Sequence, residues 1–553
     1  MRRLLVVLVL ALVSVGWPAI TVSAAGHAAT AVAAGSLQAD FDNDGFIDLA
    51  VGVPHEAIGT ATAAGAVDVL YGAPGGLTGV GSQAFWQGTG GAAGTAETFD
   101  EFGSALAAGD FNNDSFADLA VGVPSEGVGA AAAAGAVNVL YGSTGGLTGT
   151  GSQAFWQGPG GAAGALEGDD RFGSALAAGD FNADGVDDLA VGAPGEDVGT
   201  AADAGAVSVL YGSAGGLTGT GSQQFRQGAG GVGGTAEPDD RFGWALAAGG
   251  FNTNSAADLA VGVPLEDIGT VGSAGAVNVL YGSAAGLTGV GSQQFQQGAG
   301  GVPGTPESDF FGWALAAGDF NDNGFADLAV GVPLQSIGGS GFTGEVDVLY
   351  GSAGGLSGAG SQQWSQASAG VFGTAEPGDE FGRALTAGDF NNNGSADLAV
   401  GVPFEDIGAI RDAGVVNLLY GSAGGLSAAG NQQFQQGAGG VAGRAEADDW
   451  FAFALSAGDF NSNGSADLAI GVPLEDVGTI GEAGAINVLY GSAGGLASAG
   501  NQQFWQGTGG AAGTLEAGDW FGLALAGPDP ATGAAAASSR SQLGTTPLIP
   551  PER

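Results

Sequence analysis

Cysteine and lysine are both absent from the sequence, and histidine occurs only as His27 and His55. The first absence excludes disulfides, thiolate metal sites and cysteine nucleophiles. All ten basic residues are arginines, so a phosphate-binding loop that depends on lysine is also excluded. A Ser-His-Asp triad would have to use His55, and we expect that residue to lie in a surface turn instead.

Basic residues are scarce, with 10 against 56 acidic ones, so the formal net charge is −46. Such a chain repels nucleic acid and anionic membranes, which proteins bind mainly through lysine and arginine. Divalent cations and cationic partners complement this charge. The alternative is that the charge only keeps a secreted protein soluble. The sequence therefore predicts no nucleic-acid partner, and the absence of lysine suggests a GC-rich bacterial genome.

The N-terminal segment has the pattern of a signal peptide. Met1-Arg2-Arg3 is followed by an apolar run over 4–15 and by Val22-Ser23-Ala24, a small-residue cleavage site. We expect a signal peptide over 1–24 and a short segment over 25–34. The apolar run is short for a membrane span, and no later segment is long enough, so we expect a secreted protein without a membrane anchor. The Pro-, Ala-, Ser- and Thr-rich residues 528–553 are expected to form a disordered tail.

One acidic loop occurs seven times along the chain. The first copy reads Asp40-Phe-Asp-Asn-Asp-Gly-Phe-Ile-Asp48, and the others begin at Asp110, Asp180, Gly250, Asp319, Asp389 and Asp459. The spacings between successive starts are 70, 70, 70, 69, 70 and 70 residues. A fixed period of this size indicates a repeat architecture.

Each repeat predicts four short strands and no helix. In the third copy the apolar and alternating stretches cover 172–179, 189–194, 206–212 and 222–227, separated by glycine-rich turns. A four-stranded sheet repeated around an axis is a β-propeller blade. The sequence thus predicts an all-β, seven-bladed β-propeller over 35–527.

The two ends of the repeat region predict how the ring closes. The first loop lacks the Phe-x-x-Ala-Leu strand that precedes every other copy. That strand occurs instead at 521–526, with no acidic loop after it. We therefore expect this C-terminal strand to complete the first blade and remove the open edges of the array.

Three motifs in fixed order resemble the FG-GAP repeat of the integrin α-subunit N-terminal propeller and its bacterial relatives. They are Phe102-Gly103, the acidic loop and Gly122-Val-Pro124 in the second copy, and they recur in later copies, although the seventh has Phe451-Ala452. The resemblance covers about 35–527. It implies calcium in the loops between strands one and two of some blades, on the lower face, and ligand contacts through the upper-face loops.

The loops offer oxygen ligands in a pattern that calcium uses. The first, third, fifth and ninth positions supply side-chain oxygens, and the seventh can supply a carbonyl. The predicted ligands are Asp40, Asp42, Asp44 and Asp48 in loop one; Asp110, Asn112, Asp114 and Asp118 in loop two; Asp180, Asn182, Asp184 and Asp188 in loop three; Asp319, Asn321, Asn323 and Asp327 in loop five; Asp389, Asn391, Asn393 and Asp397 in loop six; and Asp459, Asn461, Asn463 and Asp467 in loop seven.

We expect several structural calcium sites whose affinity falls with the number of carboxylates, so loops one to three bind most tightly. Loop four begins with Gly250 and is predicted to hold no tight site. An EF-hand is excluded because the twelfth position is Val or Ile and never Glu. The remaining alternative is that these segments are Asx-rich β-turns that bind no metal.

Two functions remain open at this stage. The first is an extracellular binding or adhesion module, expected to be a monomer, that presents upper-face loops to a protein or glycan. The alternative is a secreted carbohydrate-active enzyme, a glycosidase or lyase, with an acidic loop site. The carboxylate pairs recur in blade after blade, which favours solvated loop acids over one catalytic site; they include Glu196-Asp197, Glu266-Asp267, Glu405-Asp406 and Glu475-Asp476. Trp86, Trp156, Trp364 and Trp505 are predicted to be packing residues.

Overall fold

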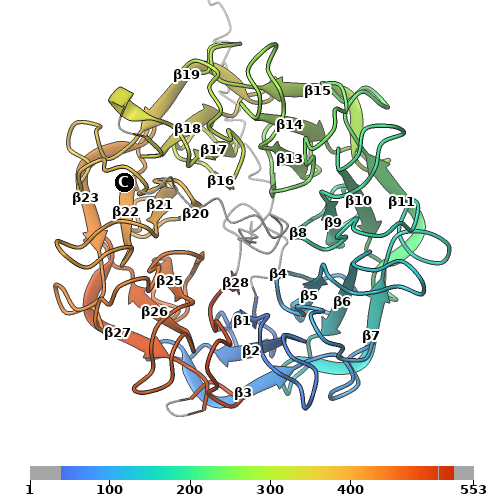
Figure 1. Cartoon of the computed structure of the whole chain (residues 1–553), viewed down its shortest axis with the longest axis horizontal. Coiled ribbons are helices and arrows are strands. Elements are labelled where there is room, and N and C mark those ends of the chain that lie inside the picture. The colour runs from blue at the N-terminus through green and yellow to red at the C-terminus, as the bar shows by residue number, and fades with distance from the viewer. Residues whose placement is uncertain (1–38, 340, 508–509, 528–553) are drawn as a thin grey trace, which may run out of the picture.

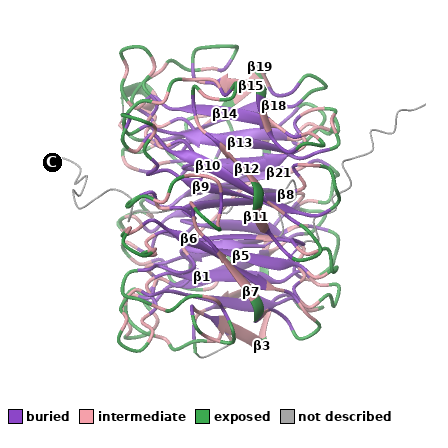
Figure 2. Cartoon of the chain, turned by 90° about the vertical axis from the view of Figure 1, so that its right-hand side faces the viewer, coloured by how far each residue is buried: buried purple, intermediate pink, exposed green. Residues whose placement is uncertain are grey.

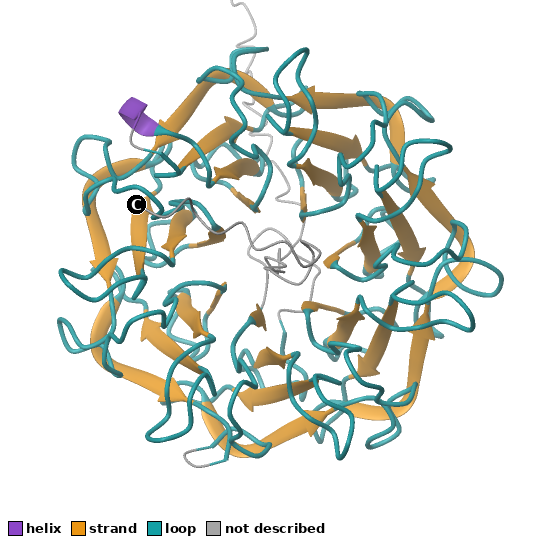
Figure 3. Ribbon diagram, viewed as in Figure 1, coloured by secondary structure: helices purple, strands orange, loops and turns teal. Residues whose placement is uncertain are grey.

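The computed structural model describes residues 39–339, 341–507 and 510–527. Seven sheets of four antiparallel strands surround a central axis, and each runs from the axis to the rim (Figure 1). One short helical turn, η1 (Ile337–Gly339), stands beside these strands in the described part of the chain (Figure 3). The predicted seven-bladed propeller is confirmed. The expected signal peptide, the segment 25–34 and the tail lie outside the described residues.

The strands fall into four classes by their place in the blade. The innermost are β28 (Ala524–Ala526), β4 (Ala105–Gly109), β8 (Ala175–Gly179), β12 (Leu246–Gly249), β16 (Leu315–Gly318), β20 (Ala384–Gly388) and β24 (Leu455–Gly458). The second are β1 (Leu49–Val53), β5 (Asp118–Val123), β9 (Asp188–Ala193), β13 (Asp258–Val263), β17 (Asp327–Val332), β21 (Asp397–Val402) and β25 (Asp467–Val472).

The third strands are β2 (Ala66–Tyr71), β6 (Ala136–Tyr141), β10 (Ala206–Tyr211), β14 (Ala276–Tyr281), β18 (Glu345–Tyr350), β22 (Val415–Tyr420) and β26 (Ala485–Tyr490). The outermost are β3 (Thr78–Phe85), β7 (Thr148–Phe155), β11 (Thr218–Phe225), β15 (Thr288–Phe295), β19 (Ser357–Trp364), β23 (Ser427–Phe434) and β27 (Ala497–Phe504). The outermost strands carry polar and small residues because one of their edges faces solvent.

The first blade combines the two ends of the chain, as predicted. Its strand order is β28-β1-β2-β3, and Leu525 of β28 is the antiparallel partner of Val51 in β1. Figure 1 shows β28 beside β1 at the axis. The seam of the ring is where the N-terminal strands β1–β3 meet β28 and blade seven, because the two ends of the chain are joined there by pairing and packing and not by a connecting loop.

Two strand boundaries differ from the prediction. The inner strand β8 begins at Ala175, because Phe172 instead forms a parallel bridge with Gly135 of the preceding blade. Strand β11 begins at Thr218 rather than 222, and its pairing with β10 shifts register between Val209 and Tyr211. The shift allows the glycine-rich segment that was expected to be a turn to join the sheet.

The hydrophobic core lies between adjacent blades. Phenylalanines of the Phe-Gly motif and of the second loop position are fully buried, as Phe102 and Phe111 show. Each such side chain contributes about 1.5–3 kcal/mol of hydrophobic stabilisation before entropy. Figure 2 shows buried residues in the strands and exposed residues mainly in the loops of the two faces.

A close approach of two glycines explains two of the sequence motifs. A Cβ added to Gly192 of the Gly-Ala-Pro motif would lie 2.2 Å from the carbonyl oxygen of Gly243, which belongs to the next Phe-Gly motif. A side chain at Gly192 therefore collides with backbone. The equivalent glycine approaches the next blade at every interface, including Gly52 to Gly103 at 2.2 Å.

Candidate metal loops and the opposite face

The ninth loop position is a buried carboxylate that accepts two backbone hydrogen bonds. In loop one, Asp48 Oδ2 accepts from Phe41 N at 2.7 Å and Asp48 Oδ1 accepts from Gly72 N at 2.9 Å. The glycine contact recurs in all seven loops, and the phenylalanine contact in loops one to six. This aspartate therefore fastens the loop to the sheet, a role that was not predicted. The glycine always follows it by 24 residues, and this constant spacing is a sequence signal for the contact.

The first loop position caps the turn. Asp40 accepts from Asp44 N at 3.0 Å through Oδ1 and from Gly45 N at 2.9 Å through Oδ2. Loops two, three, five, six and seven repeat both bonds. Loop four has Gly250 at this position and so lacks this side-chain cap.

Loop one brings three carboxylates together. Oxygens of Asp40, Asp42 and Asp48 all lie within 4.8 Å of one another, the one such group of metal-ligating side chains among the residues described. Burial raises the pKa of Asp48 to about 8, and the charges of Asp42 and Asp40 add to the rise. Calcium binds oxygens at 2.3–2.6 Å, so the trio fits one ion. Asp44, the fourth predicted ligand, lies outside the trio, and its Oδ1 accepts from Phe46 N at 2.9 Å.

In the later loops an amide side chain, and not a second carboxylate, contacts the buried ninth-position aspartate. The third-position asparagine donates from Nδ2 to the ninth-position aspartate in loops three to seven: Asn182 to Asp188 at 3.5 Å, Asn252 to Asp258 at 2.9 Å, Asn321 to Asp327 at 2.9 Å, Asn391 to Asp397 at 3.2 Å and Asn461 to Asp467 at 2.8 Å. In loop two, Asn112 Oδ1 is buried without a hydrogen-bond partner, so it is available as a ligand.

The fifth loop position also differs between loops: it is asparagine in loops four to seven and aspartate in loops one to three. In loops five, six and seven the asparagine Nδ2 donates to a blade carbonyl, as Asn323 does to Gly351 O at 3.0 Å. Loop four does so through Asn254 to Gly282 O at 3.0 Å. An aspartate at this position in loops one to three has no hydrogen to donate when ionised. Loops four to seven thus hold their shape by internal hydrogen bonds, whereas the trio in loop one requires a cation or protons.

Loops also join neighbouring blades. The backbone N of the eighth loop position donates to the first-position carbonyl of the preceding loop, as Ala257 N does to Asp180 O at 2.8 Å. A loop therefore supports the next blade as well as its own sheet.

The opposite face has a ring of seven inter-blade hydrogen bonds. In each one, a glutamine after the outer strand donates to a glutamate of the next blade: Gln87 to Glu126, Gln157 to Glu196, Gln227 to Glu266, Gln297 to Glu345, Gln366 to Glu405, Gln436 to Glu475 and Gln506 to Glu56. The prediction that the Glu-Asp pairs are solvated is therefore wrong for the glutamates. Glu196 is 3% exposed, because it lies in the interface.

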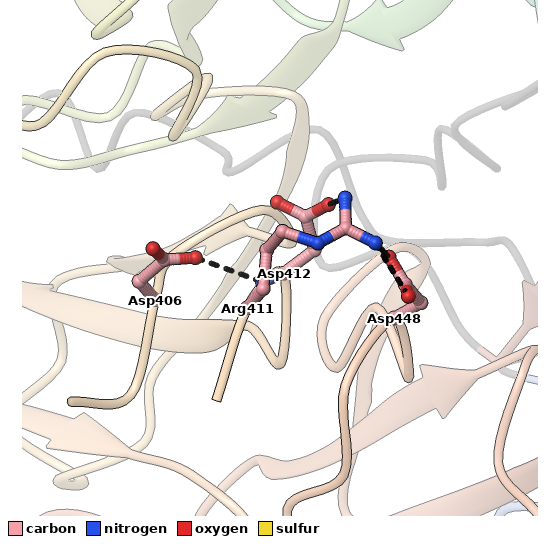
Figure 4. Close-up of polar contacts among 4 residues, drawn as sticks. All are labelled: Asp406, Arg411, Asp412 and Asp448. Atoms are coloured by element: carbon pink, nitrogen blue, oxygen red, sulfur yellow. Dashed lines mark hydrogen bonds and ion pairs between the residues drawn. The ribbon is translucent and has the colours of Figure 1, made fainter. Parts of the chain in front are cut away.

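The aspartates of these pairs close their own loops. Asp197 accepts from Asp203 N at 3.0 Å, and Asp406 accepts from Asp412 N at 2.9 Å. Figure 4 shows that Arg411 then joins two blades. Its NH2 group donates to both carboxylate oxygens of Asp448 at 2.6 and 2.7 Å, and its NH1 group donates to Asp412 at 2.9 Å. The repeated carboxylate pairs thus have structural partners.

Side chains differ from blade to blade at the residue after Phe-Gly. From blade one to blade seven this residue is Leu523, Ser104, Ser174, Trp244, Trp313, Arg383 and Phe453. The Arg383 guanidinium lies 4.8 Å from the Trp313 ring and 5.5 Å from each of Phe404 and Phe453, and it pairs with Glu380 at 2.7 Å. These side chains are buried in blades four to seven. Beneath this face there is therefore an aromatic cluster in blades four to seven and small, polar side chains in blades two and three.

His55 lies in a turn, as predicted, but is half-buried. Its ring stacks on Trp520 across the seam, with the ring centroids 4.0 Å apart, and burial lowers its pKa. The four tryptophans predicted to be packing residues are also half-buried, and Trp86 and Trp364 pack against the core.

The family model of the FG-GAP repeat matches residues 102–140, 172–210, 311–349, 381–418 and 451–489. Five segments of the chain are FG-GAP repeats. The matched segments of this FG-GAP chain cover blades two, three, five, six and seven. The two blades without a matched segment are blade four, which has the degenerate loop at Gly250, and blade one, whose inner strand is β28.

The FG-GAP chain is similar to two kinds of curated protein. It is 32% identical over 186 residues to phosphatidylinositol-glycan-specific phospholipase D of Rattus norvegicus, covering 33% of this chain and 21% of that protein. It is 28% identical over 236 residues to integrin alpha-5 of Xenopus laevis, covering 42% and 20%. The chain thus spans about a fifth of the length of these relatives.

Among solved structures, a rhamnogalacturonan lyase of Bacillus licheniformis matches the FG-GAP chain with a TM-score of 0.31 and 10% identity, covering 77% of this chain and 83% of the lyase. In the described part of the FG-GAP chain, no helix has the length and apolar character that crossing a membrane requires.

Proposed function

We propose that this FG-GAP repeat protein is a secreted, calcium-braced propeller that acts as an extracellular binding module. The observation that carries the calcium assignment is the convergence of Asp40, Asp42 and Asp48 within 4.8 Å. Carboxylate oxygens are the ligands that calcium prefers, and bound calcium supplies positive charge to an otherwise unneutralised cluster.

The loops differ in how well they fit the ion. Loop one offers the carboxylate trio, and loop two offers Asp110, Asp114 and the unpartnered Asn112 Oδ1. Loop three has the same carboxylate count as loop two, but Asn182 Nδ2 is directed to Asp188. In loops five to seven an ion has to displace shorter amide hydrogen bonds, so these sites are expected to be weaker. Loop four lacks the first carboxylate and is expected to bind no calcium.

The binding role rests on the contrast between the two faces. The metal-loop face repeats the same backbone contacts from blade to blade, which indicates a structural role. On the opposite face the residue after Phe-Gly varies from Ser104 to Trp313 and Arg383. Six of these seven side chains are buried, so seven blades that share one framework differ in the packing directly beneath this face. Such a difference makes the face asymmetric, as recognition of one protein or glycan requires.

The calcium assignment is tested by thermal unfolding and calorimetry of the full-length protein after thorough chelation. We expect calcium to raise the melting temperature, because an ion that binds only the folded state stabilises it by mass action. Asp42→Ala is expected to remove the tightest site, while Asn252→Ala in loop four leaves calcium binding unchanged. An identical melting temperature with calcium and with chelator contradicts the calcium assignment.

The binding role is tested on arrays of glycans and extracellular proteins. Binding without turnover supports the module if it is lost in Trp313→Ala under conditions where that variant is folded, and retained in the metal-loop variant Asn252→Ala. Chemical change of a polysaccharide on the same array supports the carbohydrate-active enzyme and contradicts our assignment.

A further inference from the structure

The seam lacks a contact that every other blade boundary has. At six interfaces the backbone N of the eighth loop position donates to the first-position carbonyl of the preceding loop, at 2.8–3.2 Å; the pairs are Ala117–Asp40, Asp187–Asp110, Ala257–Asp180, Ala326–Gly250, Ala396–Asp319 and Ala466–Asp389. At the seam the corresponding residues are Ile47 and Asp459, and in the described chain no such bond joins them. Loop seven instead reaches loop one through Ser462 Oγ, which donates to Gly45 O at 3.1 Å.

Gly45 is held in place by the carboxylate trio. Its backbone N donates to Asp40 Oδ2 at 2.9 Å, and Asp40 is one of the three residues that converge. Contacts therefore run without a break from Asp48 and Asp42 through Asp40 to Gly45 and on to Ser462 of blade seven. Any change that separates the three carboxylates also moves the Gly45 carbonyl, which accepts the hydrogen bond from Ser462.

Loop one also has no amide to neutralise its buried aspartate. Loops three to seven have asparagine at the third position, directed to the ninth, whereas loop one has Asp42 there. Three ionised carboxylates within 4.8 Å repel one another unless a cation is bound. The loop that depends most on a cation thus belongs to the N-terminal segment that meets the C-terminal blade at the seam.

We propose that a cation bound in loop one is the lower-face latch that fastens the seam of the ring. This inference rests on the calcium sites proposed above and adds a location for their effect. Loss of the cation separates the trio, releases Gly45 and removes the Ser462 contact. The contacts that remain at the seam then include the pairing of β28 with β1 and the hydrogen bonds of Leu77, Glu56 and Ser82. At the other six boundaries the backbone bond remains, and no chain ends meet there.

Hydrogen exchange of the full-length protein, with calcium and with chelator, tests the latch. We expect calcium removal to raise exchange in 524–526 and 41–48 by on the order of tenfold, and to change β9 and β10 far less. Asp42→Asn supplies the amide that loops three to seven have, so it should make seam exchange insensitive to calcium. The same Asp-to-Asn change at Asp184, the fifth position of loop three, should leave the calcium response of the seam as in the wild type.

A second pair of variants separates the latch from calcium binding itself. Ser462→Ala removes the contact with Gly45 and leaves the trio intact, so calcium should still bind but no longer protect 524–526. Asn392→Ala, at the same position of loop six, should retain this protection. If the wild type shows a calcium-dependent melting temperature but seam exchange responds no more than β9 and β10, the latch is overturned and the calcium sites stand. If calcium changes neither quantity, both proposals fail.

Discussion

The hydroxyl of Tyr490 accepts a hydrogen bond from the backbone N of Leu77 at 3.0 Å, although 413 positions separate the two residues. The same hydroxyl donates to Gln502, whose Nε2 donates to Leu77 O at 3.0 Å. A clamp of the same kind joins blades one and two, where Leu147 N donates to Tyr71. The same contact therefore occurs at an ordinary boundary between blades and at the seam, where the two ends of the chain meet.

Tyr490→Phe is expected to destabilise the ring at its seam. The substitution leaves Leu77 N and Gln502 Oε1 without their partner, which costs about 1–3 kcal/mol for buried polar groups. Thermal unfolding should show a lower melting temperature, and hydrogen exchange in β28 should rise.

Tyr71→Phe is the matched control, because it removes the same hydroxyl at the boundary between blades one and two, where no chain ends meet. It should also lower the melting temperature but leave β28 protected, since the ends of the ring stay joined. Equal exchange in β28 for the two variants would show that the seam is no weaker than other boundaries.

Asp68→Asn is expected to stabilise the protein. Asp68 is fully buried in β2, and neither of its oxygens has a hydrogen-bond partner in the described chain. At the equivalent place in β6, Asn138 Nδ2 donates to Ala93 O at 2.8 Å. Asparagine at 68 can make that bond, so we expect a gain of about 1–3 kcal/mol in the free energy of unfolding at pH 7.5, measured with urea.

The gain should depend on pH in a defined direction. Burial raises the pKa of Asp68 well above its ordinary value, so the wild-type carboxyl is protonated in the folded state at acidic pH. A raised folded pKa means stability that is present at low pH and lost as pH rises. The advantage of asparagine should therefore be small near pH 4 and larger at pH 7.5. Asn138→Asp should lower the free energy of unfolding, and by more at pH 7.5 than near pH 4. A gain for Asp68→Asn that does not vary with pH contradicts this account.

Periodicity made the blades and their closure predictable, because seven loops and one displaced strand define a ring without knowledge of any contact. It did not reveal which side chains meet across an interface. Glu475 was expected to be solvated, yet its partner Gln436 lies 39 residues earlier on the preceding blade. Which residues become partners across an interface depends on how adjacent blades pack, and the spacing within one repeat does not predict that packing.

The candidate metal loops were found from residue type alone, but their differences required the structure. Asn391 and Asp42 occupy the same position and both offer an oxygen. The structure shows that the amide of Asn391 is directed to Asp397, whereas Asp42 meets two other carboxylates. Hydrogen-bond direction separates the two loops, and a count of oxygen ligands cannot show it.

Gly192→Ala is expected to disrupt the boundary between blades three and four. The added Cβ would lie 2.2 Å from Gly243 O, a backbone atom that cannot move without displacing the next inner strand. Overpacking of this kind costs about 1–3 kcal/mol and sometimes more. The melting temperature and the soluble yield should both fall. Gly75→Ala is the control, because a Cβ there meets no atom within 4 Å, and its stability should match the wild type. A normal melting temperature for Gly192→Ala would contradict the close approach of the two glycines.

Glu475→Gln is expected to flatten the pH dependence of stability. Burial raises the pKa of Glu475 to about 7, against an ordinary 4.5, and the nearby charges of Asp449 and Glu446 add to the rise. Between these two values the folded state holds a proton that the unfolded state has lost, so the free energy of unfolding falls as pH rises from about 4.5 to about 7.

Glutamine retains an oxygen acceptor for Gln436 and has no proton to lose. Urea unfolding at pH 4.5 and pH 7.5 should therefore show a smaller fall for Glu475→Gln than for the wild type, by on the order of 2 kcal/mol. Asp476→Asn removes a neighbouring exposed charge and should keep the wild-type slope. If both variants flatten the slope equally, net charge rather than the buried glutamate is responsible, because only Glu475 lies in the blade interface.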